Sequence, residues 1–350
     1  MTAITKYFVG GEREAFIAGT GSSLAWTTTA GHYDADFSRG AVRLPVNGNT
    51  AYIDTPLSSP QNECYVGLMH YMESPLGGSP NPSNTAWFLF INASLVGLYR
   101  VMGIGGTITQ PLLQWQYWNG TAWTAAGPGF VVPTDIIHKW DFQFKADPAA
   151  GFARAYVDGV LLGELTGDTE LVTPYAISNM RVMTCGSSSN NTAGTPNISE
   201  VQILDVSTLG RRLATLAITA AGASNTFATG TYADIDEAGI YSDTDFMAST
   251  TSAQQYSCVT SDLSTAAQSY LVDGVVIAYR LQKGGSGPQN LKGLVRIGGV
   301  DYFSSASVPA IVTAFGYSWA DFPQNPATSA NFTPTEINTV GFETGAQSQP

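Results

Sequence analysis

Residues 112–124 read LLQWQYWNGTAWT, and this stretch decides the fold class. Apolar and polar side chains alternate over much of 112–118, which is the period of a β-strand with two different faces. Asn119-Gly120 follows, and this dipeptide favours the positive φ angles of a type I′ turn between antiparallel strands. We therefore predict a β-hairpin, with 121–124 as its second strand.

The rest of the chain repeats these strand signals and carries few helical ones. Residues 63–72 and 87–91 are largely apolar runs, and Asp158-Gly159 marks a second tight hairpin. Helical pattern is confined to residues 263–270 and to a single turn at 334–338. Many short strands at a spacing of about 8–12 residues indicate an all-β chain made of β-sandwich or jelly-roll units.

Composition excludes several classes of protein. Of 350 residues, 44% are apolar, which is enough for a sizeable core, whereas only 12% are charged. Long amphipathic helices need charged residues on their solvent-exposed face, so a helical bundle is not expected. The net charge of −12 argues against a partner such as nucleic acid, because phosphate-backbone binding needs clustered cations.

No segment has the pattern of a membrane span or a signal peptide. The most apolar stretch, 87–98, is interrupted by polar residues and falls short of the roughly 20 residues that a spanning helix needs. Residues 1–16 carry four charged side chains and lack a continuous apolar core. We therefore expect synthesis in a cytoplasm and no membrane insertion.

Two β units joined by a connector are predicted. A strand at 199–205 ends the first unit, small residues then run from 214 to 231, and strand alternation resumes near residue 270. We place the first unit at 1–207, the connector at 208–234 and a second β-sandwich domain at 235–350.

Five short signals follow one another through the first unit. They are YDADF at 33–37, the tryptophan hairpin at 115–123, WDFQF at 140–144, YVDG at 156–159 and ISEV at 198–201. In this order they resemble a concanavalin A-like, laminin-G-like jelly roll across residues 30–205. The resemblance implies a jelly-roll fold for the first unit, and the whole chain is then two tandem β-sandwich domains.

Residues 200–346 carry a more specific pattern. Its parts are TLGRRL at 208–213, IDE at 235–237, NPAT at 325–328, FTPTEIN at 332–338 and GFE at 341–343. This pattern is similar to that of tailed-bacteriophage virion proteins of the tail-associated or fibre-like kind. The resemblance implies a structural component of a virion, on the tail or tail tip, that assembles with copies of itself and with other virion proteins.

The sequence predicts no catalysis. Glycoside hydrolases of the concanavalin-like fold carry a Glu-x-Asp-x-x-Glu run that sets two carboxylates on one strand face, and no such run occurs here. No Gly-x-Ser-x-Gly elbow accompanies the three histidines. A polysaccharide depolymerase is accordingly the least favoured reading, and a non-enzymatic protein is expected.

No metal and no cofactor are predicted. Cys64, Cys185 and Cys258 stand far apart without CxxC spacing and are expected to be free thiols. Residues 234–245 resemble half of an EF-hand loop, but two ligand positions are unsuitable, so an exposed acidic turn is expected. The laminin-G-like resemblance makes three aspartates conceivable calcium ligands, although no spacing selects them: Asp34, Asp36 and Asp158.

The aromatic hairpin supports an alternative function, that of a host-surface glycan-binding adhesin. Trp115 lies on one strand face and Trp118 on the other, together with two glutamines, so one set faces the core. The candidate residues for glycan or interface binding are Trp115, Trp118 and Trp123. In an adhesin Trp118 and Trp123 are expected to be partly exposed, whereas in a structural subunit they are expected to be buried in the sandwich or under a neighbouring chain.

Overall fold

The computed structural model describes residues 4, 6–18, 23–44, 51–74, 85–107, 109–184, 194–237, 239–285, 287–310 and 314–350. Strands dominate these residues, and the α-helical part described is the single turn α1 (Pro334–Ile337). The predicted all-β class is therefore confirmed. The chain divides into two compact units, Thr5–Leu213 and a second that holds residues 214–350.

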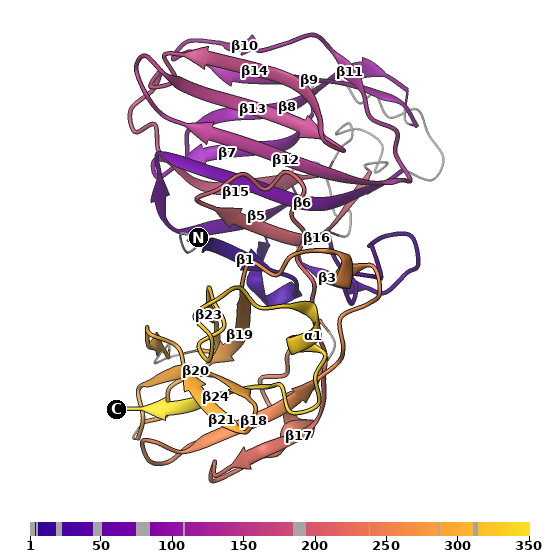
Figure 1. Ribbon diagram of the computed structural model, residues 1–350. Helices are drawn as coiled ribbons and strands as arrows, with labels where there is room; N and C mark the ends of the chain where they lie inside the picture. The colour runs from indigo at the N-terminus through magenta and orange to yellow at the C-terminus, as the bar shows by residue number, and fades with distance from the viewer. Residues whose placement is uncertain are drawn as a thin grey trace. The chain divides into compact units, whose positions relative to one another are not determined.

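The first unit consists of two antiparallel sheets, which can be followed as two layers in Figure 1. Sheet A has the order β14-β13-β12-β6-β16-β4-β3, with β1 also paired to β16. Its strands are β1 (Lys6–Gly10), β3 (Ala25–Thr27), β4 (Ala41–Arg43), β6 (Glu63–Glu73), β12 (Ile137–Lys145), β13 (Gly151–Val157), β14 (Val160–Gly167) and β16 (Thr195–Leu204).

Sheet B has the order β10-β9-β8-β7-β15-β5-β2, and β11 also pairs with β9. Its strands are β2 (Ile17–Ala18), β5 (Tyr52–Gln61), β7 (Ala86–Asn92), β8 (Gly97–Gly106), β9 (Pro111–Trp118), β10 (Trp123–Ala125), β11 (Phe130–Val131) and β15 (Ile177–Met183). Strands distant in sequence are neighbours in both sheets, as in a jelly roll.

Aromatic side chains fill the space between the two sheets. Phe88 and Phe90 of β7 meet Trp140 and Phe142 of β12, with ring centroids 4.9 Å apart for Phe88–Trp140 and 4.8 Å apart for Phe90–Phe142. All four of these side chains are fully buried. Because alternate residues of a strand point to opposite faces, the intervening residues of β12 lie on the outer face of sheet A.

The two predicted tight turns differ in geometry. Asp158-Gly159 joins β13 to β14 with φ values of 49° and 80°, as a type I′ turn requires. The other connection is longer than predicted, because Trp118 pairs with Trp123 and four residues, 119–122, form the loop. There the side chain of Asn119 accepts hydrogen bonds from the backbone N–H groups of Thr121 and Ala122, which replaces the type I′ turn.

The second unit packs a two-stranded sheet against a six-stranded one. The six-stranded sheet runs β17-β18-β24-β20-β21, with β22 paired to β20. Tyr279 donates a hydrogen bond of 2.7 Å from its hydroxyl to the carbonyl of Gly345, which joins the two layers. The strands are β17 (Ile218–Asn225), β18 (Gln255–Thr260), β20 (Asn290–Ile297), β21 (Val300–Phe303), β22 (Val308–Pro309) and β24 (Glu343–Gln349), with β19 (Val275–Leu281) and β23 (Gly316–Phe322) in the smaller sheet.

The terminal part of the phage-like pattern builds this second unit. The Thr333 hydroxyl accepts a hydrogen bond from the Glu336 backbone N–H and the Glu336 carboxylate accepts one from the Thr333 N–H, which together form a capping box at the start of α1. Asn325 is fully buried and donates to Glu336. The carboxylate of Glu343 is buried and accepts hydrogen bonds from Ser257 and the Ala223 N–H. The hydrogen bonds of these residues therefore stabilise the local structure of the second unit.

Three further predictions need adjustment or fall partly outside the described residues. The segment 208–234 is divided between the units and contains strand β17, so its small residues form a sheet edge rather than a connector. Residues 263–270 hold only a 3₁₀ turn at Ala267–Ser269. Cys64 and Cys258 are buried free thiols, as predicted, whereas Cys185 lies outside the described residues.

Candidate functional site

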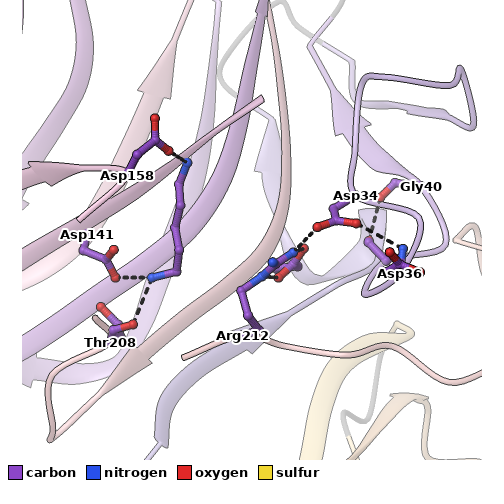
Figure 2. A network of polar contacts seen from close by, with 10 residues as sticks. Asp34, Asp36, Gly40, Asp141, Asp158, Thr208 and Arg212 are labelled. Atoms are coloured by element: carbon purple, nitrogen blue, oxygen red, sulfur yellow. Dashed lines mark hydrogen bonds and ion pairs between the residues drawn. The ribbon is translucent and has the colours of Figure 1, made fainter. Parts of the chain in front are cut away.

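A buried polar network crosses the outer face of sheet A (Figure 2). Lys139 of β12 donates from Nζ to Asp141 Oδ1 at 2.5 Å and to the carbonyl of Thr208 at 2.9 Å. Thr208 itself is fully buried, and its hydroxyl donates to the carbonyl of Val66 on β6. Gly67 makes room for it, because a Cβ there would lie 2.8 Å from the Thr208 Cβ. The segment around Thr208 is thus fastened onto the sheet.

Arg212 holds a second part of the same face (Figure 2). Its guanidinium pairs with Glu200 at 2.6 Å and with Asp34 at 2.6 Å, and it lies 3.7 Å from the ring centroid of Phe37. Burial raises the pKa of Glu200 despite the adjacent arginine. The charges compensate one another, so this network fixes residues 207–213 against the sheet.

The conceivable calcium ligands do not converge. Asp34 is occupied by Arg212, whereas Asp158 accepts from the Lys139 N–H and contacts His138 Nδ1 at 2.7 Å. His138 is buried between this carboxylate and the Pro133 carbonyl. Among the described residues, no group of three or more His, Cys, Asp or Glu side chains could hold a metal ion.

The acidic turn at 234–245 is a hydrogen-bonded loop. Asp234 accepts hydrogen bonds from the N–H and hydroxyl of Thr231, and these bonds lower its pKa. A hydrogen bond with Asp234 raises the pKa of Asp245, and Asp243 pairs with Arg280. Ala238, one of the unsuitable ligand positions, lies outside the described residues.

The three predicted tryptophans separate into two environments. Trp115 is fully buried, stacks on Tyr99 at 5.8 Å and donates its indole N–H to the Ala153 carbonyl. It therefore belongs to the core and cannot touch a ligand, which removes it from the candidate set. Trp118 and Trp123 point outward from sheet B and are half-buried. In a single chain this partial exposure is compatible with the adhesin alternative and equally with a surface that a neighbouring chain covers.

Trp118 and Trp123 lie on the outer face of β8, β9 and β10. Their rings meet edge to face, with centroids 5.6 Å apart at an angle of 61°. Trp123 reaches across β9 to β8, where a Cβ on Gly97 would lie only 3.0 Å from its ring. The glycine therefore lets the indole lie flat against the sheet.

A row of polar side chains continues from the two tryptophans. The guanidinium carbon of Arg100 lies 4.1 Å from the ring centroid of Trp123, and its Nε donates to Gln116 Oε1 at 2.8 Å. Gln116 donates in turn to Gln114 at 2.9 Å, and Gln114 donates to the Gly127 carbonyl. We call Arg100, Gln114, Gln116, Trp118 and Trp123 the tryptophan face.

The tryptophan face can offer two kinds of contact to a ligand. Half-exposed indole rings provide apolar surface for stacking, and amide and guanidinium groups provide hydrogen bonds around it. Burial lowers the pKa of Arg100 to about 10, so this side chain carries its charge at neutral pH. Sequence reasoning identified the alternation of Gln114, Gln116 and Trp118 but missed Arg100, because only strand pairing brings β8 beside β9.

Comparisons with known proteins find likenesses to solved structures alone. No protein-family model matches the sequence, and no curated protein matches it. Among solved structures, an endo-β-1,4-glucuronan lyase from the fungus Trichoderma reesei matches with 10% identity and a TM-score of 0.43, over 57% of this chain and 95% of that one. An endo-1,3-β-glucanase from Streptomyces sioyaensis has 11% identity and a TM-score of 0.35, over 58% and 97%. A carbohydrate-binding module from Bacillus subtilis has 12% identity and a TM-score of 0.31, over 55% and 96%.

These neighbours correct one prediction. The sequence predicts a non-enzymatic protein, and that prediction is contradicted because two of these jelly-roll structures are named as enzymes. The missing Glu-x-Asp-x-x-Glu run excludes one arrangement of two carboxylates and does not exclude catalysis on such a fold. The TM-scores lie below 0.5, so the activity in each name is a property of that protein and is not transferred to this chain.

No helix within the described ranges has the length and apolar character needed to cross a membrane.

Proposed function

We propose that the first unit binds carbohydrate on its tryptophan face. The observation that carries this proposal is the pair Trp118 and Trp123, which are adjacent, half-buried and directed away from the core. The C–H groups of a sugar ring stack well on an indole face, and the cost of exposing two large aromatic side chains to water is then offset by the ligand.

The polar part of the face supports the same proposal. Gln114 and Gln116 hold each other and Arg100 in fixed positions through side-chain hydrogen bonds. Sugar hydroxyls both donate and accept, and amide groups can satisfy both roles. The orientation of these groups before a ligand arrives lowers the entropy cost of binding.

Carbohydrate binding is the activity that the adhesin alternative requires. A place on a phage particle, with assembly partners on the tail, stays a prediction from the resemblance of residues 200–346. Mass spectrometry of purified virions would test that prediction separately, because it reports presence on the particle whatever the tryptophan face binds.

The test of the proposed function is a glycan array probed with the full chain and with the Trp118→Ala and Trp123→Ala variants. We expect the wild type to bind at least one glycan and each variant to lose at least about tenfold in affinity, since one stacked aromatic contributes on the order of 1–3 kcal/mol. The matched control is Trp319→Ala, which removes a half-buried tryptophan of the second unit.

Stability measurements separate binding from folding. The midpoint of thermal unfolding should fall by no more than a few degrees in Trp118→Ala, because the side chain is not part of the core. Absence of glycan binding in the wild type would refute the proposal. So would equal binding by the wild type and both tryptophan-face variants.

A further inference from the structure

Five arginines of the described chain lie over aromatic rings, and one of them differs from the rest. Four also pair with at least one carboxylate: Arg154 with Glu164, Arg181 with Asp54, Arg212 with Glu200 and Asp34, and Arg280 with Asp243. Arg100, which lies over Trp123, has no carboxylate partner among the described residues.

The difference follows from strand register. Arg154 and Glu164 are direct cross-strand partners, and so are Arg181 and Asp54. The direct partner of Arg100 on β9 is Gln116, a neutral amide of nearly the same shape as glutamate. The position that holds an acid beside other stacked arginines therefore holds an amide here.

The chemistry of this arrangement is specific. Gln116 receives a hydrogen bond from Nε of Arg100, and no described side chain accepts from the two Nη groups. In a chain with 27 acidic and 15 basic residues, a half-buried guanidinium without an acid is unusual. Burial also lowers the pKa of Arg100, because the charged guanidinium is partly desolvated, and no nearby acid counteracts this effect. A bound anion would offset the free-energy cost of this desolvation.

We propose that the tryptophan face selects glycans that carry carboxylate groups, such as uronic acid polymers, and that the guanidinium of Arg100 binds the carboxylate. This inference rests on the proposed carbohydrate binding. Because Arg100 covers one face of Trp123, a sugar ring stacks on Trp118 and places its carboxylate beside the free Nη groups. A guanidinium and a carboxylate form two parallel charge-assisted hydrogen bonds, which a neutral sugar cannot reproduce.

The test compares charged glycans with their own neutral forms. Polygalacturonate, alginate and hyaluronate are each measured against their carboxyl-reduced counterparts by isothermal titration calorimetry with the full chain. Each pair has the same linkages, so only the carboxylate differs. We expect at least one acidic polymer to bind about tenfold or more tightly than its reduced form.

Two variants assign the preference to Arg100. Arg100→Gln removes the cation, and Gln116→Glu supplies the carboxylate that the other stacked arginines have. Both are expected to bring the ratio of affinities for charged and reduced polymers to near one, while stacking on Trp118 keeps the reduced polymers bound. The matched control is Arg154→Gln, which removes a stacked arginine already paired with Glu164.

The outcomes distinguish the two proposals. Equal affinity for charged and reduced polymers in the wild type overturns the role of Arg100 and leaves carbohydrate binding intact. A preference that survives both Arg100→Gln and Gln116→Glu also overturns it. Failure to bind any polymer of either kind overturns carboxylate selection, and the glycan array then decides whether carbohydrate binding itself stands.

Discussion

The carboxyl group of Glu12 should make the first unit less stable as pH rises, and its removal should abolish this loss of stability. Glu12 is 5% exposed, and one carboxylate oxygen has no hydrogen-bond partner among the described residues. Burial raises the pKa of Glu12 from its ordinary value of 4.5 to about 7, and the nearby Arg39 offsets only part of this effect. The folded state therefore binds a proton that the unfolded chain has already released.

The sign and size of the effect follow from linkage. A raised folded pKa gives stability that is complete below pH 4.5 and is lost as pH rises through about 7. A rise of this size corresponds to about 3 kcal/mol. The Glu12→Gln variant has no charge to bury, so at pH 8 its free energy of unfolding should exceed that of the wild type by up to about 3 kcal/mol, and the difference should vanish near pH 4.5.

Urea unfolding followed by tryptophan fluorescence measures this difference, because six of the seven tryptophans lie in the first unit. Burial lowers the pKa of His70 to about 3, which removes stability as pH falls below 6.5, but this effect is common to both proteins and cancels in the comparison. The control is Glu63→Gln, at an exposed position. A difference between wild type and Glu12→Gln that stays constant from pH 4.5 to 8 would refute the reasoning.

Two further substitutions test how the first unit is held together. Trp115→Ala removes a fully buried indole and should cost about 3–5 kcal/mol in urea unfolding, and a cost below about 1 kcal/mol would contradict its place in the core. Gly67→Ala places a Cβ against Thr208 and should cost about 1–3 kcal/mol, with faster amide hydrogen exchange at residues 207–209; unchanged exchange there would mean that the segment does not depend on this contact.

Local sequence predicted those features that depend on neighbouring residues. Asp158-Gly159 forms the expected tight hairpin connection, and both backbone positions have the positive φ of a type I′ turn. The single helical turn expected near 334–338 is present as α1, and Thr333 and Glu336, only three positions apart, cap its start. The hairpin at Asn119-Gly120 formed, but the type I′ turn predicted for it did not. The Asn119 side chain accepts hydrogen bonds from backbone N–H groups inside the loop, an alternative that the dipeptide alone does not reveal.

Features that depend on contacts between segments far apart in the sequence were not predictable. Alternation placed Trp115 and Trp118 on opposite faces, but it could not say which face is buried. That choice depends on sheet B meeting the aromatic side chains of β12, more than 20 residues further along the chain. The pairing of Arg212 with Asp34 joins residues that are 178 positions apart, and no local pattern indicates it.

The same limit explains why the charge at the candidate site escaped sequence reasoning. Arg100 and Arg181 each lie over an aromatic ring on the outer face of sheet B, and the sequence around them gives no reason to treat them differently. Pairing of β15 with β5 sets Asp54 opposite Arg181, whereas pairing of β8 with β9 sets Gln116 opposite Arg100. The charge of Arg181 is thereby compensated by Asp54 within the fold, whereas the charge of Arg100 has no acidic partner among the described residues and lies beside two half-exposed tryptophans. The ligand preference that we propose therefore depends on a single cross-strand position, which is why Gln116→Glu tests it most directly.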